Sequence, residues 1–115
     1  MGSINISQSF PLLNITGDLT IIKNTELYSL FLSGIDQISV SIGKNPILDL
    51  YIESSSLIDL SIWETLTRRI DIISQYISNI RIENNRILQE IITNDIITVD
   101  KITLLNNPKL EMINY

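Results

Sequence analysis

Residues 80–88 read Ile80-Arg81-Ile82-Glu83-Asn84-Asn85-Arg86-Ile87-Leu88: two apolar residues flank a polar one, asparagine follows, and leucine comes three positions later. The same signature recurs three times, at residues 19–27, 40–48 and 102–110. A weaker copy begins at Leu60, with Thr65 and Arg68 in place of asparagine and leucine. The five copies begin at residues 19, 40, 60, 80 and 102, so the period is 20–22 residues. A fixed period of this length is typical of solenoids, in which each repeat stacks on its neighbours.

Each repeat carries the two-residue periodicity of β-strands. Apolar and polar residues alternate over residues 38–42 and 58–62, and Leu50 and Ile52 are matched one repeat later by Ile70 and Ile72. The chain contains 25 isoleucines and no alanine, a bias that favours strands over helices. Each repeat is therefore expected to supply two short strands joined by polar turns.

These features predict a mainly β protein, a right-handed parallel β-solenoid of about five coils of 20–22 residues, over residues 19–115. Residues 1–18, with Phe10-Pro11-Leu12-Leu13, are expected to form an N-terminal cap or an assembly arm. A solenoid needs such a cover because its end coils expose unpaired backbone groups and apolar core.

The asparagine and leucine columns are predicted to form a structural ladder. A turn asparagine tolerates left-handed backbone geometry, and its amide can bond turn backbone groups or the next asparagine in the stack. The leucine three residues later is expected to point into a core one coil wide. The ladder comprises Asn24, Asn45, Asn85 and Asn107 together with Leu27, Leu48, Leu88 and Leu110.

The good copies, above all residues 102–110, resemble leucine-rich-repeat solenoids, and their Asn-x-x-Leu spacing is most similar to the L domains of growth-factor receptors. The resemblance covers residues 19–115. The chain differs from receptor L domains in lacking cysteine-bonded caps and in being shorter. The resemblance implies a parallel solenoid that holds its ligand on the exposed face of the sheet.

A helical alternative also fits part of the chain. Residues 63–97 contain a heptad pattern, with apolar residues at most a and d positions and Asn84 at an a position. This pattern predicts a β-rich head followed by an oligomeric coiled-coil stalk. Against it, Ile72, Ile82 and Leu88 would lie outside the helical seam and face solvent.

Two outward rows form the candidate binding face of the solenoid. The first is Thr20, Ser41, Ser61, Arg81 and Thr103, and the second is Ile22, Gly43, Trp63, Glu83 and Leu105. Trp63 is the expected anchor, Arg81 and Glu83 are expected charged contacts, and Gly43 is expected to let a partner approach closely. The alternative is a solvated sheet face, with Trp63 packed at a bend of the weaker copy.

Composition excludes several functions. The formal net charge is −5, with 13 acidic and 8 scattered basic residues, which argues against nucleic-acid binding. The chain has neither cysteine nor histidine, and no nucleotide-binding glycine motif, so we predict no catalytic residue, metal or cofactor. Asp18, Asp59 and Asp100 are candidate carboxylates for polysaccharide hydrolysis, but their predicted spacing is unfavourable.

No segment resembles a signal peptide or a membrane span, so we expect no membrane insertion and a location in the cytoplasm or within a virus particle or assembly. Met1-Gly2-Ser3 also matches what an expression tag leaves behind. Because the sequence stops at Tyr115 within a repeat, the last coil is expected to associate with a second copy or another protein. The leading hypothesis is a non-catalytic, self-associating structural protein of a fibre, virion or surface assembly. The alternative is a module that recognises a protein or a glycan, and a polysaccharide-acting enzyme ranks third.

Overall fold

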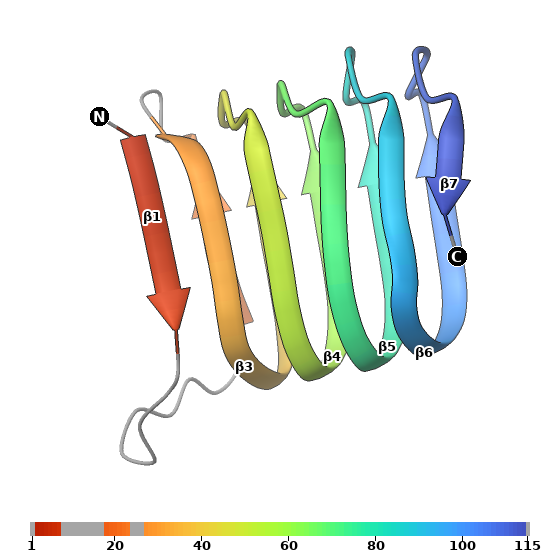
Figure 1. Ribbon diagram of the computed structural model, residues 1–115. Coiled ribbons are helices and arrows are strands. Elements are labelled where there is room, and N and C mark those ends of the chain that lie inside the picture. Colours follow the sequence, from red (N-terminus) through yellow and green to blue (C-terminus); the bar gives the residue numbers. More distant parts are fainter. Residues whose placement is uncertain (1, 8–17, 24–26, 115) are drawn as a thin grey trace.

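The computed structural model describes residues 2–7, 18–23 and 27–114, and all regular structure in these ranges is β-strand (Figure 1). Every hydrogen-bonded strand pair in these ranges is parallel. The strands wind into a parallel β-solenoid, which confirms the predicted fold class, with about four turns where about five coils were expected. The elements are β1 (Gly2–Ser7), β2 (Asp18–Ile22), β3 (Leu27–Gly43), β4 (Asp49–Trp63), β5 (Arg69–Glu83), β6 (Glu90–Leu105) and β7 (Met112–Asn114).

Each of the long strands β3 to β6 bends in its middle and so forms two arms, which we call the front arm and the rear arm (Figure 1). In β5 the buried residues 70, 72 and 74 alternate with less buried ones, the alternation breaks at residues 75–76, and residues 77, 80 and 82 are buried again, so we assign residues 69–74 to the front arm and 77–83 to the rear arm. Viewed as in Figure 1, the chain runs down the front arm, up the rear arm and on toward β7, which is a right-handed winding. One front arm and the following rear arm make a rung, so the front arms form one parallel sheet and the rear arms another.

The heptad alternative is wrong. Residues 63–97 lie in the last residue of β4, in β5, in β6 and in the turns between them, without a helix. Ile72, Ile82 and Leu88, which the helix would have exposed, are at most 1 % exposed. Within the described ranges there is likewise no helix long and apolar enough to cross a membrane.

The core is a single layer of aliphatic side chains between the two sheets. In β5 the front arm contributes Ile70 and Ile72 and the rear arm contributes Ile77, Ile80 and Ile82, all 1 % exposed or less. Equivalent residues of neighbouring rungs are in register, so Leu60 pairs with Ile80 and Ile62 with Ile82. The β-branched residues suit this packing because their stiff side chains stand upright on a pleated surface.

Buried serines satisfy the backbone where a rung bends. Ser54 and Ser74 pair in register. Each lies within hydrogen-bond distance of a carbonyl two residues on, with Ser54 Oγ 3.1 Å from the Ser56 oxygen and Ser74 Oγ 3.2 Å from the Tyr76 oxygen. A short hydroxyl side chain thus bonds a backbone carbonyl locally where the rung bends.

The turns at the other end of each rung contain the asparagine column. The left-handed residue is the one before the asparagine, or before Thr65 in the weaker copy, because Lys44, Glu64, Asn84 and Asn106 have φ angles of 52° to 56°. The prediction that the asparagine itself takes this conformation is therefore wrong. The left-handed residue continues the inter-rung ladder through its own N–H, for example from Lys44 to the Trp63 carbonyl at 3.1 Å.

The predicted asparagine hydrogen bonds are present, and each side chain reaches back to the preceding rung. Asn85, fully buried, accepts from the Thr65 N–H (3.1 Å) and hydroxyl (2.8 Å) and donates to the Ile62 carbonyl (3.3 Å). Asn107 repeats the pattern, accepting from Asn85 and donating to the Ile82 carbonyl at 2.9 Å. Asn45 donates to the Ile21 carbonyl at 2.9 Å. Asn24 lies outside the described residues.

The predicted leucine column is only partly correct. Leu88 is fully buried and Leu110 is half-buried against the core, but Leu48 is 52 % exposed. The turns differ in length: five residues precede β4 and β5 (44–48 and 64–68), but six precede β6 (84–89). The turn position whose side chain points into the core, which is Leu88 in the longer turn, therefore falls one residue earlier in the shorter turns. There Ile47 and Thr67 occupy it, both fully buried. Leu27 begins β3, but its side chain lies outside the described part.

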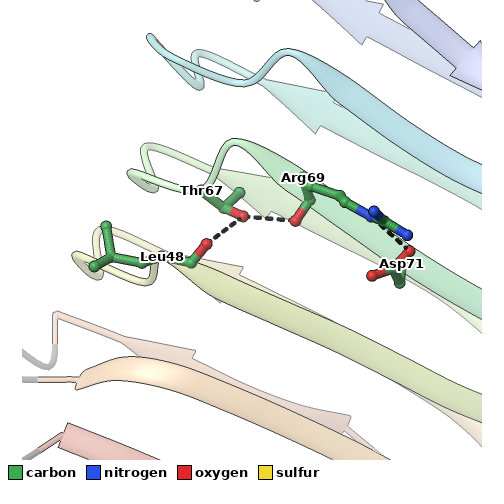
Figure 2. Close-up of polar contacts among 4 residues, drawn as sticks. All are labelled: Leu48, Thr67, Arg69 and Asp71. Atoms are coloured by element: carbon green, nitrogen blue, oxygen red, sulfur yellow. Dashed lines mark hydrogen bonds and ion pairs between the residues drawn. The ribbon is translucent and has the colours of Figure 1, made fainter.

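Thr67 shows how a polar residue is tolerated in that inward position. Its hydroxyl oxygen lies 3.1 Å from the Leu48 carbonyl and 2.8 Å from the Arg69 carbonyl, so its one proton is shared between two backbone acceptors (Figure 2). The hydroxyl thereby links the turn of one rung to that of the preceding rung. The weaker repeat copy thus keeps its turn closed without leucine or asparagine.

The N-terminal segment contributes to the solenoid. β1 pairs with the front arm of β3 and β2 with its rear arm, so together they supply both arms of a first rung. Residues 8–17 between them, including Phe10-Pro11-Leu12-Leu13, lie outside the described residues. The cap or assembly arm predicted for residues 1–18 therefore stays a prediction for residues 8–17.

We expect Asn85→Ala to lower the free energy of unfolding by about 2–3 kcal/mol, because it leaves the buried Thr65 N–H and Ile62 carbonyl without their partner. Urea denaturation measures this effect. Asn79→Ala is the matched control, since Asn79 is exposed, and it should cost well under half as much. Equal costs for both variants would contradict the role of the buried column.

Candidate functional site

The two predicted outward rows exist and are in register along the rear arms. Pairing runs Thr20, Ser41, Ser61, Arg81, Thr103 in the first row and Ile22, Gly43, Trp63, Glu83, Leu105 in the second. A third row beside them was not predicted as part of the face, and it holds Asp18, Ser39, Asp59, Asn79 and Lys101. We call the surface formed by these three rows the rear face.

A groove of about 610 Å³ crosses the rear face along the first and third rows. Its lining includes Ser41, Ser61, Arg81, Asp59 and Asn79. The floor of the groove is the outer surface of a parallel sheet, whose backbone N–H and C=O groups bond neighbouring rungs. A ligand in the groove must therefore be recognised by side chains alone.

The hydroxyls of the first row are not engaged by any other residue that the structure describes. Within the described part of the chain, the side chains of Thr20, Ser41, Ser61 and Thr103 make no hydrogen bond. In the third row, by contrast, Asp59 accepts from Asn79 Nδ2 at 2.7 Å and from Ser39 Oγ at 3.5 Å. The groove thus combines a row of unused hydroxyls with a carboxylate and an amide that hold each other in place.

Trp63 lies flat against Gly43 on the neighbouring rung. A Cβ added to Gly43 would sit 2.1 Å, 2.3 Å and 2.6 Å from Trp63 Cε2, Cζ2 and Cδ2. Three contiguous ring atoms at similar distances mean that the indole covers the glycine with its face. The expectation that Gly43 admits a partner is therefore wrong, because the space that its missing side chain leaves is filled by Trp63 itself.

The indole borders a second hollow, of about 260 Å³, which opens into the groove. Ser41, Ser61 and Arg81 line both spaces, and Trp63 and Glu83 line the second one. The structure therefore brings all five predicted face residues together. Among them Arg81 Nε donates to the Glu83 carboxylate, so the two expected charged contacts are engaged with each other.

The candidate carboxylates are not assembled as a catalytic pair. Asp18 and Asp59 share a column but stand two rungs apart, or about 10 Å at the spacing of paired strands. Asp100 is outside that column, because Lys101 occupies the corresponding position on its strand. The Asp100 carboxylate instead accepts a hydrogen bond from the Tyr76 hydroxyl at 2.5 Å. No group of three or more carboxylates that could hold a metal occurs among the described residues.

The opposite side of the solenoid carries an apolar groove that the sequence analysis missed. It measures about 520 Å³, and its lining includes Leu48, Leu66, Ile87, Arg69 and Asp71. Arg69 Nε donates to Asp71 Oδ1 at 3.1 Å along its edge (Figure 2). The sequence contains an indication of this groove, because each of three successive turns contributes one of its apolar residues, Leu48, Leu66 and Ile87. Whether such a residue faces the core or solvent depends on whether its turn has five or six residues, and the repeat pattern does not show this difference.

Comparisons with protein families, with curated proteins and with solved structures find no match to this chain. The parallel solenoid is consistent with the repeat-level likeness to leucine-rich repeats, but no family match confirms that the chain is one of them.

We expect Gly43→Ala to displace the indole of Trp63 from the sheet, since the new methyl group would overlap three ring atoms. Trp63 is the single tryptophan, so its emission should move to longer wavelength as the ring becomes hydrated. Stability should fall by no more than about 1 kcal/mol, because a half-exposed ring can swing outward. Ser41→Ala is the control on the same strand, and an unchanged emission spectrum in Gly43→Ala would contradict the stacked geometry.

Proposed function

We propose that this chain is a non-catalytic interaction protein that recognises its partner through the rear face. The observation that carries the proposal is the groove in which hydroxyls without a partner among the described residues adjoin the half-exposed indole of Trp63. Polar groups that converge beside an aromatic ring are the usual composition of a binding site. Recognition on a sheet face is also the binding mode that the likeness to leucine-rich repeats implies.

The rigidity of the rear face supports the same proposal. The strands beneath it are paired on both sides in β3, β4 and β5, and the core below them is fully buried. Side chains on such a surface lose little conformational freedom on binding, which lowers the entropic cost of association. Ser41 and Ser61 gain further order from being half-buried.

A second candidate function is self-association, as expected of a structural protein of a fibre or other assembly. Its support is the rear arm of β6, with which no described strand pairs on its far side. Val99, Ile102 and Leu104 there are half-buried, whereas Ile77, Ile80 and Ile82 in the same columns of β5 are at most 1 % exposed. A second copy covering this edge would bury the remaining apolar surface and pair the open backbone groups.

For recognition, the test is capture from an extract of the source cells by immobilised protein. We expect Ser41→Arg, which fills the groove with a long charged side chain, to retain less than a tenth of the material captured by the unmodified protein. Ile58→Arg is the matched control, because Ile58 is 49 % exposed and does not line the groove. Equal capture by the two variants, or no capture by the unmodified protein, would contradict recognition through the rear face.

For self-association, the absence of cysteine allows a clean cross-linking test. Thr103→Cys places a thiol on the edge strand, and Ser61→Cys places one in the same row two rungs inward. With a short bis-maleimide, Thr103→Cys should give covalent dimers whose yield rises with protein concentration, while Ser61→Cys should stay monomeric. Equal yields from both variants, or a monomer by size-exclusion chromatography at high concentration, would contradict association through this edge.

A further inference from the structure

The chemistry of the groove restricts the class of ligand that recognition through the rear face can serve. The backbone N–H and C=O groups beneath the groove are already hydrogen-bonded between neighbouring rungs. The groove therefore offers no open strand edge with which an extended peptide could pair. It also offers no apolar pocket for peptide side chains, since the first and third rows contain only polar residues along the floor. This inference rests on the rear-face recognition proposed above and asks what is recognised.

The free groups on the floor are hydroxyls. A serine or threonine hydroxyl carries one donor and two acceptor positions, and those of Ser41, Ser61 and Thr103 are unused within the described part of the chain. Groups that both donate and accept are best matched by ligand groups that do the same. Asp59 and Asn79 add a planar acceptor and a planar donor in the next row, held together at 2.7 Å. Such a surface is complementary to a ligand rich in hydroxyls.

Trp63 supplies an apolar platform beside these polar groups. One face of the indole lies on Gly43, so its opposite face is directed away from the sheet, and the ring borders the hollow that joins the groove. Sugar rings have the complementary construction, with an apolar face of C–H groups and a polar edge of hydroxyls. Stacking on the indole would therefore leave the ring edge free to reach the floor hydroxyls.

The charges that line the two connected hollows cancel. Asp59 and Glu83 contribute two negative charges, and Arg81 and Lys101 contribute two positive ones. Arg81 is paired with Glu83, and Asp59 accepts two hydrogen bonds from neutral side chains. The groove thus has no excess of either sign with which to select an anionic or cationic ligand.

We propose that the groove binds a neutral oligosaccharide, with one sugar ring stacked on Trp63 and the chain running along the solenoid axis over the hydroxyl row. Hydroxyls recur on three neighbouring rungs, at Thr20, Ser41 and Ser61, about 4.8 Å apart, and Arg81 separates Ser61 from the next one, Thr103. Successive sugar units can therefore meet similar contacts on those three rungs. The ligand class follows from the juxtaposition of free hydroxyls, a face-on indole and cancelled charge.

The single tryptophan allows binding to be followed directly. The intact protein is titrated with four neutral hexasaccharides, the β-1,4-linked glucose, mannose and xylose oligomers and the β-1,3-linked glucose oligomer. Hexagalacturonate serves as the charged comparison. We expect saturable quenching or a blue shift of Trp63 emission with at least one neutral hexasaccharide, and at least tenfold weaker binding of hexagalacturonate.

Two variants locate the binding. The double substitution Ser41→Gln and Ser61→Gln fills the floor without adding charge and should weaken binding at least tenfold, while Ile58→Gln should leave it unchanged. Far-ultraviolet circular dichroism confirms that each variant is folded. Binding that is unaffected by the double substitution, or that favours hexagalacturonate, would overturn the inference.

The outcome also separates this inference from the broader proposal. If no neutral hexasaccharide binds at millimolar concentration but Ser41→Arg still loses capture from the extract, recognition through the rear face stands and the carbohydrate inference is wrong. If the extract experiment fails as well, both are wrong. Isothermal titration calorimetry provides a second readout of binding that does not depend on the environment of Trp63.

Discussion

A turn asparagine that reaches to the rung before it, at Asn45, Asn85 and Asn107, is the contact on which this solenoid depends; in the turn of residues 64–68 Thr65 stands at this position. Every rung must return the chain through a tight turn, and the turn's backbone groups lie too deep to be paired by water. Asn85 accepts from the Thr65 N–H and donates to the Ile62 carbonyl, and Asn107 does the same for Asn85 and Ile82. Since an unpaired buried backbone group costs about as much as a lost hydrogen bond, the amide at this position constrains the stacking of whole rungs.

This constraint explains which parts of the turn can vary. The first residue of the turn needs a left-handed conformation, yet lysine, glutamate and asparagine all occupy it. The number of residues in the turn also varies, because the next strand restarts in register whether the turn has five or six residues. The turn thus tolerates different side chains at its first residue, while the inward position stays buried whether isoleucine, threonine or leucine fills it.

The same regularity determines where a specific surface can arise. Parallel stacking repeats each outward position once per rung, so a perfect repeat would present uniform rows. The copy that departs most from the signature, residues 60–68, supplies Trp63, and its indole fills the space left by Gly43 on the rung before. The irregular rung therefore places a single large aromatic side chain at the centre of the rear face. The apolar groove on the other side has a different origin, because the lengths of the turns place Leu48, Leu66 and Ile87 outside the core.

The sequence alone was sufficient for the strand periodicity, the parallel register, the core columns and the outward rows, because all of these follow from a period near twenty and an alternation of two. The sequence also identified the asparagine column, because an asparagine repeated in every similar turn is expected to hydrogen-bond the backbone of that turn or of its neighbour. Tertiary structure alone decided that Ile47 replaces Leu48 in the core, that Trp63 lies on Gly43, and that Arg81 is paired with Glu83, while the serine side chains beside it make no hydrogen bond to the residues that the structure describes. Those outcomes depend on turn length and on side-chain contacts between rungs, which a one-dimensional period does not specify.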